Sequence, residues 1–377
     1  MKILLVDLDH GFITRSEHVP KCLGLAKYST FLKKNGHEVF YGSCKVVPKI
    51  YPDVIAFSPI FKFKLNKDLA YIKAFAKKFP NAEIHIGGVQ ATYDDTKIIG
   101  ELPRAKIFKG IQEFDSEKPD YKLIGKFFSF GFTSRGCVRQ CPWCLVPRTE
   151  GKLHTIPYWT NSLENGHSLF LLMDNNILAC GADWLEHIFI ELKTRKMKID
   201  FNQGLDIRIF VKSKEIQNLF FKYKHLYNFL RFSWDSSSVD SVVLESLEIL
   251  KKLGKEVRWY MLYGFNDTPE QIFFRIKTLM ETKGFTSLIK PMLYKDLDTG
   301  ETPSFYGKAF NWYMAKVASA SNFITPSSFK LGKFGHNEDE FKRVLKLGDN
   351  YRLLTKTIGG NVNVKNRNSV IKYIKKT

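Results

Sequence analysis

The stretch GCVRQCPWC, Gly136–Cys144, places three cysteines within eight residues, and the next cysteine along the chain is Cys180. A metal site that only holds a fold together normally has four protein ligands. The spacing of Cys137, Cys141 and Cys144 instead lets one tight loop wrap three corners of an iron–sulfur cube, so that the fourth iron is left for a ligand that is not protein. The motif therefore predicts a cluster with one open position.

Two other kinds of cysteine site receive less support from the sequence. A structural zinc site needs a fourth ligand, and the nearby His154 and His167 lie beyond Pro147 in a polar stretch without a paired-ligand pattern. An electron-transfer cluster needs a fourth cysteine, often followed by proline. Cys180 stands alone and has no such context.

Length and composition indicate a globular protein with a sizeable core, since 377 residues are 44% hydrophobic. The first residues, MKILLVDLDH, predict a buried strand rather than a signal peptide, and no run approaches the roughly 20 apolar residues of a membrane span. A disulfide framework is not expected in a chain without a secretory signal. We therefore expect a cytoplasmic protein without a membrane partner, in which Cys22, Cys44 and Cys180 are buried inert thiols.

The net charge of +20 has two explanations that the sequence leaves open. An excess of 58 Lys and Arg over 38 Asp and Glu suits a polyanionic partner such as nucleic acid. Lys outnumbers Arg 45 to 13, which the codon bias of an AT-rich genome also explains. Residues 341–377 carry ten basic residues and one acid, Asp349, a pattern typical of a nucleic-acid contact and of a solvated end.

Residues 1–115 alternate short apolar runs with amphipathic stretches. Predicted strands are KILLVD, HEVFYG, DVIAFSPIF and AEIHIGG, and predicted helices are CLGLAKYSTFLKKNG and LAYIKAFAKKFP. Strands that alternate with helices imply a parallel sheet covered on both faces. We expect a Rossmann-like, doubly wound α/β domain over residues 1–115 and a polar linker over residues 116–127.

From residue 128 onward, six further strand candidates follow one another. They are FFSFGFT, SLFLLM, KIDFNQ, NFLRFS, VRWYMLYG and SLIKPMLY. Most are separated by roughly the length of one strand–helix unit, which predicts a partial (βα)6 barrel over residues 128–300. Residues 301–377 are expected to form a mostly helical extension with a basic tail. Barrel chemistry gathers in loops after the strands, and Gly136–Cys144 follow the first strand of this series.

These features resemble the radical S-adenosylmethionine (SAM) enzymes, whose hallmark is Cys-x3-Cys-x-aromatic-Cys after the first strand of a partial barrel. Trp143 occupies the aromatic position. In that family the open iron of a 4Fe-4S cluster is chelated by SAM, and an electron from the cluster splits SAM to a 5′-deoxyadenosyl radical. The resemblance implies an electron donor such as a flavodoxin or ferredoxin, for which Arg135, Arg139 and Arg148 are candidate docking residues.

The resemblance also implies SAM contacts at the ends of later strands. The segment LLMDNNILA resembles the variant that binds the SAM amino group, although Asp and Asn equally favour a helix N-cap. An arginine in an apolar strand is costly unless paired, so Arg231 is expected to pair with the SAM carboxylate. The full set of implied contacts is Trp143, Asp174, Asn175, Asn176, Asn202, Gln203, Asp206, Arg208, Arg231, Ser233, Asp235 and Gly264.

The first domain resembles the cobalamin-binding domain of one branch of these enzymes, on the run from Pro20 to Val39 and on Gly87 and Gly88. That branch has an Asp-x-His-x-x-Gly motif that ligates cobalt. The run from Asp7 to Gly11 has a different spacing, so His10 is not carried over as a ligand. Since many members lack the motif, cobalamin remains an expectation that a fold resemblance alone does not establish.

The sequence therefore predicts a radical SAM enzyme that modifies an unidentified substrate, with a nucleic acid or its precursor as one candidate. If cobalamin binds, the alternative is a methyltransferase of a small molecule or peptide. An alternative of another class is a non-enzymatic zinc or iron–sulfur protein that binds nucleic acid. This last alternative predicts no cleavage of SAM.

Overall fold

The computed structural model describes residues 1–8, 22–44, 46–124, 128–282, 286–302, 306–311, 313–314 and 338–348. The chain divides into two compact units, Met1–Gln203 and Gly204–Thr377. His10, Pro20 and most of the predicted basic tail, residues 349–377, lie outside the described residues.

The first unit opens with a parallel sheet in the order β2-β1-β3-β4-β5. Its strands are β1 (Lys2–Asp7), β2 (Glu38–Ser43), β3 (Val54–Phe57), β4 (Glu83–Ile86) and β5 (Lys106–Ile107). This order reverses between β1 and β3, as in doubly wound folds. The predicted Rossmann-like sheet is confirmed. The two-residue strand β5 was not predicted, because so short a strand leaves no apolar pattern to detect.

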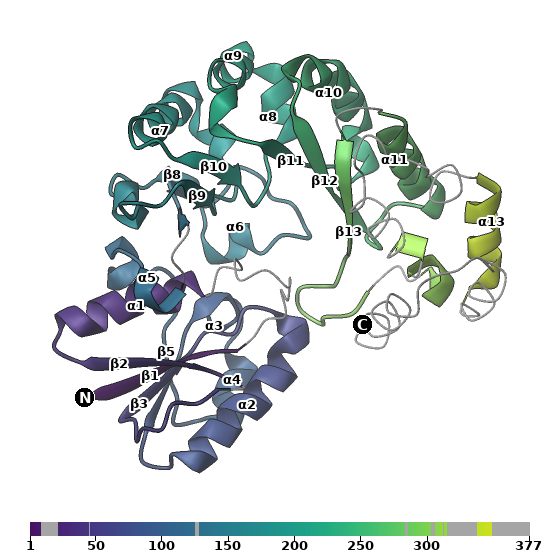
Figure 1. Ribbon diagram of the computed structural model, residues 1–377. Coiled ribbons are helices and arrows are strands. Elements are labelled where there is room, and N and C mark those ends of the chain that lie inside the picture. The colour runs from purple at the N-terminus through teal and green to yellow at the C-terminus, as the bar shows by residue number, and fades with distance from the viewer. Residues whose placement is uncertain are drawn as a thin grey trace, which may run out of the picture. The chain divides into compact units, whose positions relative to one another are not determined.

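Helices cover both faces of this sheet, as Figure 1 shows. Leu5 packs in one apolar cluster with Leu25 of α1 (Leu23–Lys34), whereas Leu4 packs in another with Leu69 of α2 (Leu65–Lys78). Successive side chains of a strand point to opposite faces, so the continuous apolar run of β1 requires cover on both sides. The short helices α3 (Gly88–Tyr93) and α4 (Thr96–Glu101) follow β4.

The segment predicted as a linker packs against α1. Ser29 Oγ donates a hydrogen bond of 2.7 Å to Asp120 Oδ2, and the short helix α5 (Tyr121–Ile124) follows immediately. Tyr121 is buried in a cluster with Ala26 of α1 and Phe130 of the next strand. Within the first unit, this segment therefore joins the first sheet to the elements that carry the cysteines.

All six strands predicted for the second part of the chain are present and parallel. The first unit contains a sheet in the order β10-β9-β6, and the second contains one in the order β11-β12-β13. Their bounds are β6 (Ser129–Gly131), β9 (Leu169–Leu172), β10 (Lys198–Phe201), β11 (Phe229–Ser233), β12 (Glu256–Tyr263) and β13 (Thr286–Leu293). The α/β class with parallel sheets is confirmed, with the six strands in chain order.

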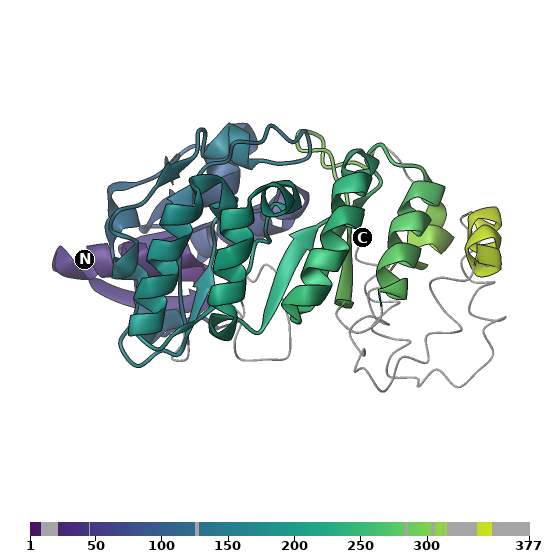
Figure 2. The same cartoon turned by 90° about the horizontal axis from the view of Figure 1, so that it is seen from above.

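Helices follow these strands as strand–helix units require. They are α7 (Ala182–Thr194), α8 (Ile207–Lys212), α9 (Lys214–Lys222), α10 (Asp240–Leu253) and α11 (Pro269–Glu281). Figure 2 shows the green helices of the second unit lying alongside its strands. The 3-10 turns are η1 (Lys62–Lys64), η2 (Glu113–Ser116), η3 (Trp159–Ser162), η4 (Ile177–Cys180), η5 (Lys224–Leu226) and η6 (Ser237–Val239).

The described part of the predicted C-terminal extension is helical. Residues 307–311 and 313–314 are helical, as is α13 (Glu338–Leu347). Phe341 of α13 stacks on Phe273 of α11 with 4.4 Å between ring centroids, which attaches the extension to the second unit. Among the described helices, none combines the length and the apolar character needed to cross a membrane.

A buried ion pair holds the second unit together beneath its strands. Arg275 of α11 is 0% exposed and donates to Asp267 Oδ2 at 2.5 Å and to the carbonyl of Trp234 at 2.9 Å. The other carboxylate oxygen of Asp267 accepts from the amide of Ser237 at 3.1 Å. Burying the two charges is tolerable because hydrogen bonds surround both groups.

Replacing Arg275 with Met should destabilise the protein by about 3 to 5 kcal/mol, because Asp267 is left as a buried charge without its cation. Urea unfolding followed by circular dichroism measures the loss. Lys342→Ala, which removes only the exposed ion pair with Glu338, is the matched control and should leave the unfolding midpoint unchanged. Equal midpoints for all three proteins would contradict a structural role for Arg275.

Candidate functional site

The cysteine loop leaves the end of β6 and is closed by a short antiparallel pair. β7 (Ser134–Arg135) pairs with β8 (His154–Thr155), and α6 (Val146–Thr149) lies between them. Gly136 has a φ of +74°, and a Cβ at this position would lie 2.4 Å from the carbonyl oxygen of Lys152. Only glycine fits this turn without a shift of backbone, so Gly136 fixes how the loop begins.

The three predicted cysteine ligands belong to this loop, and each is half-buried. Cys137 Sγ accepts from the backbone amide of Arg139 at 3.3 Å and from Asn176 Nδ2 at 3.5 Å. The amide of Cys144 donates to the carbonyl of Cys141 at 3.0 Å, which makes a turn between these two thiols. N–H donors directed at sulfur suit a thiolate that ligates iron, so the donor set fits an iron–sulfur cluster.

No three His, Cys, Asp or Glu side chains among the described residues converge as they would around a single metal ion. In a 4Fe-4S cluster each thiolate binds a different iron, so the ligands surround the cluster instead of meeting at one point.

Glu150 holds the cysteine loop in place, and the sequence analysis missed it. Its Oε1 accepts from Arg135 at 3.0 Å, and its Oε2 accepts from the amide of Gly136 at 3.1 Å and from Asn175 Nδ2 at 2.8 Å. One carboxylate thus joins both ends of the loop to the segment after β9. A single Glu in a polar stretch carries no sequence signal, because its role depends on chain segments that meet only in the fold.

Arg135 extends this network toward the first sheet. Its second guanidinium nitrogen lies 3.3 Å from Asp115 Oδ1, and its Cζ lies 3.6 Å from the ring centroid of Phe132. Lys27 of α1 donates to the carbonyl oxygen of Asp115. Burial lowers the pKa of Lys27 to about 8. The contacts from Lys27 through Asp115 and Arg135 to Glu150 connect α1 with the cysteine loop.

Asp174, one of the predicted SAM contacts, binds its own chain. It is 2% exposed, and its carboxylate accepts from the Thr133 amide, Thr133 Oγ1 and Ser134 Oγ, each at 2.6 Å. Burial raises its pKa to about 6, against these stabilising hydrogen bonds. Asp174 therefore fixes the end of β9 to the segment that leads into the cysteine loop.

Among the other predicted contacts of the first unit, two form hydrogen bonds with residues of the cysteine loop. Asn175 and Asn176 reach it through Glu150 and Cys137, respectively. Asn176 occupies the N-cap position of η4 but makes no side-chain cap bond there. Trp143 is half-buried within the loop itself. Asn202 Nδ2 lies 3.7 Å from Met173 Sδ.

In the second unit, two predicted contacts pair with each other. Asp206 is the N-cap of α8 and accepts from the amide of Arg208 at 3.1 Å. Both oxygens of Asp206 also accept from the Arg208 guanidinium, at 2.9 and 3.2 Å. This bidentate pair is a local feature of the helix start, with the guanidinium about one-third exposed.

The remaining predicted contacts lie along β11 and after β12. Burial lowers the pKa of Arg231, whose Cζ lies 4.5 Å from the ring centroid of Phe229. Ser233 ends the strand. Asp235 Oδ1 accepts from the amide of Leu262 at 3.1 Å, and burial raises the pKa of Asp235 to about 6. Gly264 has a φ of +80°, which favours glycine at this turn.

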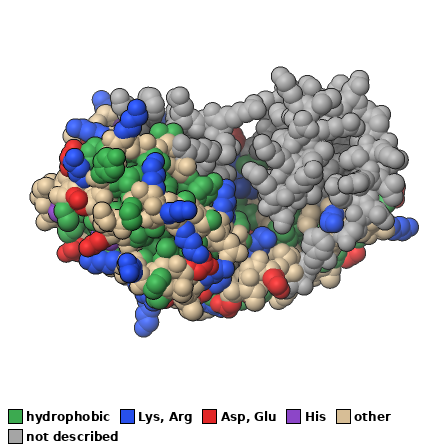
Figure 3. Space-filling model, turned by 90° about the horizontal axis from the view of Figure 1, so that it is seen from below, with side chains coloured by type: hydrophobic (Ala, Val, Ile, Leu, Met, Phe, Trp, Pro, Cys, Tyr) green, Lys and Arg blue, Asp and Glu red, His purple; other side chains and the backbone are tan. Residues whose placement is uncertain are grey.

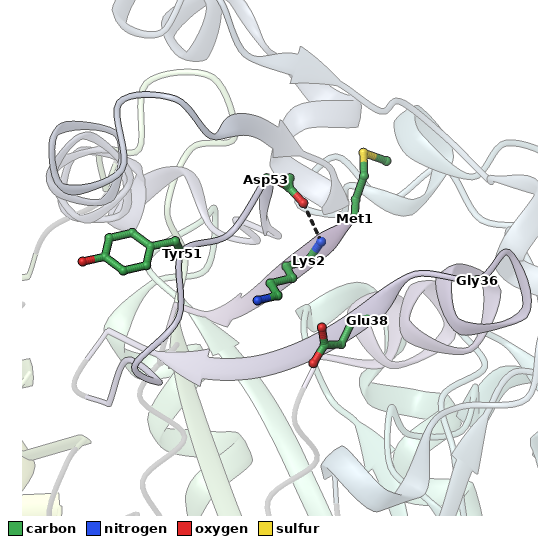
Figure 4. Close-up of a pocket in the computed structure, with 6 residues that line it drawn as sticks. All are labelled: Met1, Lys2, Gly36, Glu38, Tyr51 and Asp53. Atoms are coloured by element: carbon green, nitrogen blue, oxygen red, sulfur yellow. Dashed lines mark hydrogen bonds between the residues drawn. The ribbon is translucent and has the colours of Figure 1, made fainter.

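A pocket at the amino end of the first sheet is shown in Figure 4. It is lined by Met1, Lys2, Gly36, Glu38, Tyr51 and Asp53. The amide of Lys2 donates to Asp53 Oδ2 at 2.7 Å. Open parallel sheets bind ligands at the carboxyl ends of their strands, so this pocket lies at the opposite end from an expected site.

No protein-family model matches the chain. The tRNA-2-methylthio-N(6)-dimethylallyladenosine synthase of Aquifex aeolicus (strain VF5) is 32% identical over 122 residues, which cover 30% of this chain and 26% of that protein. The match supports the radical SAM superfamily. The chain spans about a quarter of the length of this curated relative, so the superfamily is supported while the relative's own reaction does not transfer.

The chain also has a partial likeness to a solved structure. Coproporphyrinogen III oxidase (HemN) from Escherichia coli, described as a radical SAM enzyme, matches 64% of this chain and 53% of its own, with 11% identity and a TM-score of 0.31. The resemblance to radical SAM enzymes comes from the sequence match and the cysteine motif.

Replacing Glu150 with Ala should lower the iron that the protein retains after anaerobic reconstitution, because the Gly136 amide and Arg135 lose their shared acceptor. Iron and sulfide content per chain, with the visible absorption of the cluster, measure the effect. Glu164→Ala, which removes a surface pair with Lys118, is the control and should retain wild-type iron. Full cluster content in the Glu150 variant would contradict the proposed role of Glu150 in holding the cysteine loop.

Asp174 should make stability depend on pH. An unfolded Asp titrates near ~3.9, and burial raises the pKa of Asp174 to about 6. Stability is full below the unfolded pKa and falls as pH rises through 6, because the native state retains a proton that the unfolded chain has already released. The loss is about 2 to 3 kcal/mol.

Urea unfolding of the wild type and of Asp174→Asn at pH 4 and pH 7 tests this expectation. The wild type should lose stability relative to the variant as pH rises, whereas exposed Asp183→Asn should follow the wild type. The same pH dependence in the wild type and in Asp174→Asn would show that Asp174 does not titrate in this range.

Proposed function

We propose that the protein is a radical SAM enzyme that cleaves SAM reductively and modifies a nucleic acid. The carrying observation is a glycine-started loop of three half-buried thiols, Cys137, Cys141 and Cys144, one of which accepts N–H hydrogen bonds. Three protein thiolates leave one iron of a 4Fe-4S cluster for SAM. When bound, the cluster and SAM together supply the electron and the adenosyl radical.

The chain's own residues position and shield these groups. Gly136 and Glu150 set the entrance of the loop, and Asn176 directs an amide toward Cys137 Sγ. Hydrogen bonds to ligating sulfur shift the reduction potential of a cluster. We therefore assign Asn176 to tuning the cluster as well as to its predicted place beside SAM.

For SAM itself, four of the predicted contacts have another role in the fold. Asp174 binds Thr133 and Ser134, Asp206 and Arg208 bind each other, and Asp235 accepts from the amide of Leu262, so we assign these four residues to supporting the fold. The contacts that we retain in the proposal are Trp143, Asn175, Asn176, Asn202, Gln203, Arg231, Ser233 and Gly264. Of these, Asn175 and Asn176 donate hydrogen bonds to Glu150 and to Cys137 Sγ in the loop, and they are the first choice for mutation.

The nucleic-acid substrate is supported by two observations. The matched relative is named for a modified adenosine in tRNA, and the net charge of this chain is +20. Lys and Arg side chains, with acids between them, are spread over the face drawn in Figure 3, so net charge by itself does not locate the interface. The proposed electron donor is a flavodoxin or ferredoxin, for which Arg139 and Arg148 in the loop offer positive charge.

Cobalamin has no support from the comparisons, so the methyltransferase alternative is not part of the proposal. The experiment that tests the proposed enzyme also distinguishes it from the non-enzymatic alternative. It expects a bound metal with no SAM cleavage, whereas the proposal expects both the cluster and its reaction.

Anaerobic reconstitution followed by SAM and a strong reductant should yield 5′-deoxyadenosine, measured by chromatography. Cys141→Ala should abolish the product, because the cluster loses a ligand. Cys44→Ala, which removes a thiol near the carbonyl of Asp7, should retain it. A complete cluster that neither binds nor cleaves SAM would overturn the proposed function.

A further inference from the structure

One face of the sheet in the second unit gathers positive charge. Arg231 of β11 is the direct strand partner of Arg258 of β12, and Tyr260 of β12 is the direct partner of Lys290 of β13. Neighbouring strands lie about 4.8 Å apart. The three cations therefore project from three adjacent strands on the same side of the sheet.

The pleat of the strands fixes this side. Four side chains of β11 and β12 are 0% exposed: Leu230, Phe232, Val257 and Trp259. The residues that alternate with them are half-buried. Burial thus alternates with a period of two, and the buried positions form the core of the unit. The other side of the described strands carries Phe229, Arg231, Ser233, Glu256, Arg258, Tyr260, Leu262, Leu288, Lys290 and Met292.

Aromatic rings on this side hold the cations close together. The Cζ atoms of Arg231 and Arg258 lie 4.5 and 3.5 Å from the centroid of the same ring, that of Phe229. Lys290 Nζ lies 5.4 Å from the centroid of Tyr260. Aromatic faces attract cations, so the rings hold like charges together that would otherwise repel.

This strand face has more basic than acidic side chains. Glu256 is the one acid among the ten positions of this described strand face, and it pairs with Arg258 at 2.7 Å. Burial lowers the pKa of Lys290, and the charge of Arg231 lowers it further. The ten positions of this face therefore carry three cations and one acid. A bound anion would relieve their repulsion.

We infer that this strand face, with Lys290 and Arg258 beside Arg231, binds a phosphate group of the substrate. The inference rests on the proposed function and narrows its substrate class. A carboxylate carries one charge and matches one guanidinium, whereas a phosphate presents several oxygens to several donors at once. Arg258 and Lys290 are not among the predicted SAM contacts, so the SAM carboxylate does not account for them.

A phosphate can come from a nucleotide or from a nucleic acid, and the choice of probes distinguishes the two sources. The probes are therefore adenosine 5′-monophosphate and a short single-stranded RNA. Both are used with the reconstituted full-length protein, and acetate at matched ionic strength serves as the carboxylate comparison.

Lys290→Ala and Arg258→Ala should each weaken binding of the phosphate probe about fivefold to tenfold and lower the salt dependence of RNA binding by about 0.7 per lost phosphate contact. Lys290→Arg should restore much of the affinity. Lys252→Ala, on the exposed side of α10, is the control and should bind as the wild type does. Protection by the monophosphate identifies a nucleotide source, and protection by RNA alone identifies a nucleic acid.

A second measurement avoids any effect of mutation on folding. The rate at which an amine-reactive reagent labels Lys290 in the wild type is followed by mass spectrometry, with Lys252 as the internal control. Phosphate probes should slow labelling of Lys290 selectively. Equal labelling with and without both probes, unchanged affinity in the variants, or equal protection by acetate would overturn the inference.

The two proposals fail separately. Formation of 5′-deoxyadenosine without phosphate protection of Lys290 would leave the radical SAM function in place and reject the phosphate site. Protection of Lys290 in a protein that does not cleave SAM would support the phosphate site and reject the proposed reaction.

Discussion

The carboxylate of Glu150 is the contact on which the cysteine loop depends. It accepts from the amide of Gly136, from Arg135 and from Asn175, so three segments of the chain meet at one group. A buried or half-buried carboxylate with several donors resists displacement, because removing it leaves those donors without their acceptor. The turn at Gly136, where the thiol-bearing loop begins, is held by this carboxylate through the Gly136 amide.

The same network connects the first sheet with the candidate metal centre. Arg135 joins Glu150 to Asp115, and Asp115 accepts from Lys27 of α1 through its carbonyl oxygen. Preorganised ligands lower the cost of arranging a site when its cofactor binds. The first sheet thus contributes to the cysteine loop through packing and charge, whatever ligand its own strand ends take.

In the second unit, one face of the sheet forms the apolar core and the other face carries charged side chains. Trp259 and its alternate neighbours form the core, beneath which Arg275 and Asp267 make a buried ion pair. The other face carries Arg231, Arg258 and Lys290. Parallel strands that are covered on both sides have continuous apolar runs, whereas burial alternates along β11 and the first part of β12, so their second face also carries polar and charged side chains.

The sequence by itself determined the strand order along the chain, the α/β class and the loop that bears Cys137, Cys141 and Cys144, because apolar periodicity and ligand spacing are local properties. Only the tertiary structure decided which polar residues meet. Glu150, and the strand face of Arg258 and Lys290, carry no local signal, and Asp174 turned inward to bind Thr133 and Ser134. Their roles depend on register and on contacts between distant segments, which spacing along one chain does not encode.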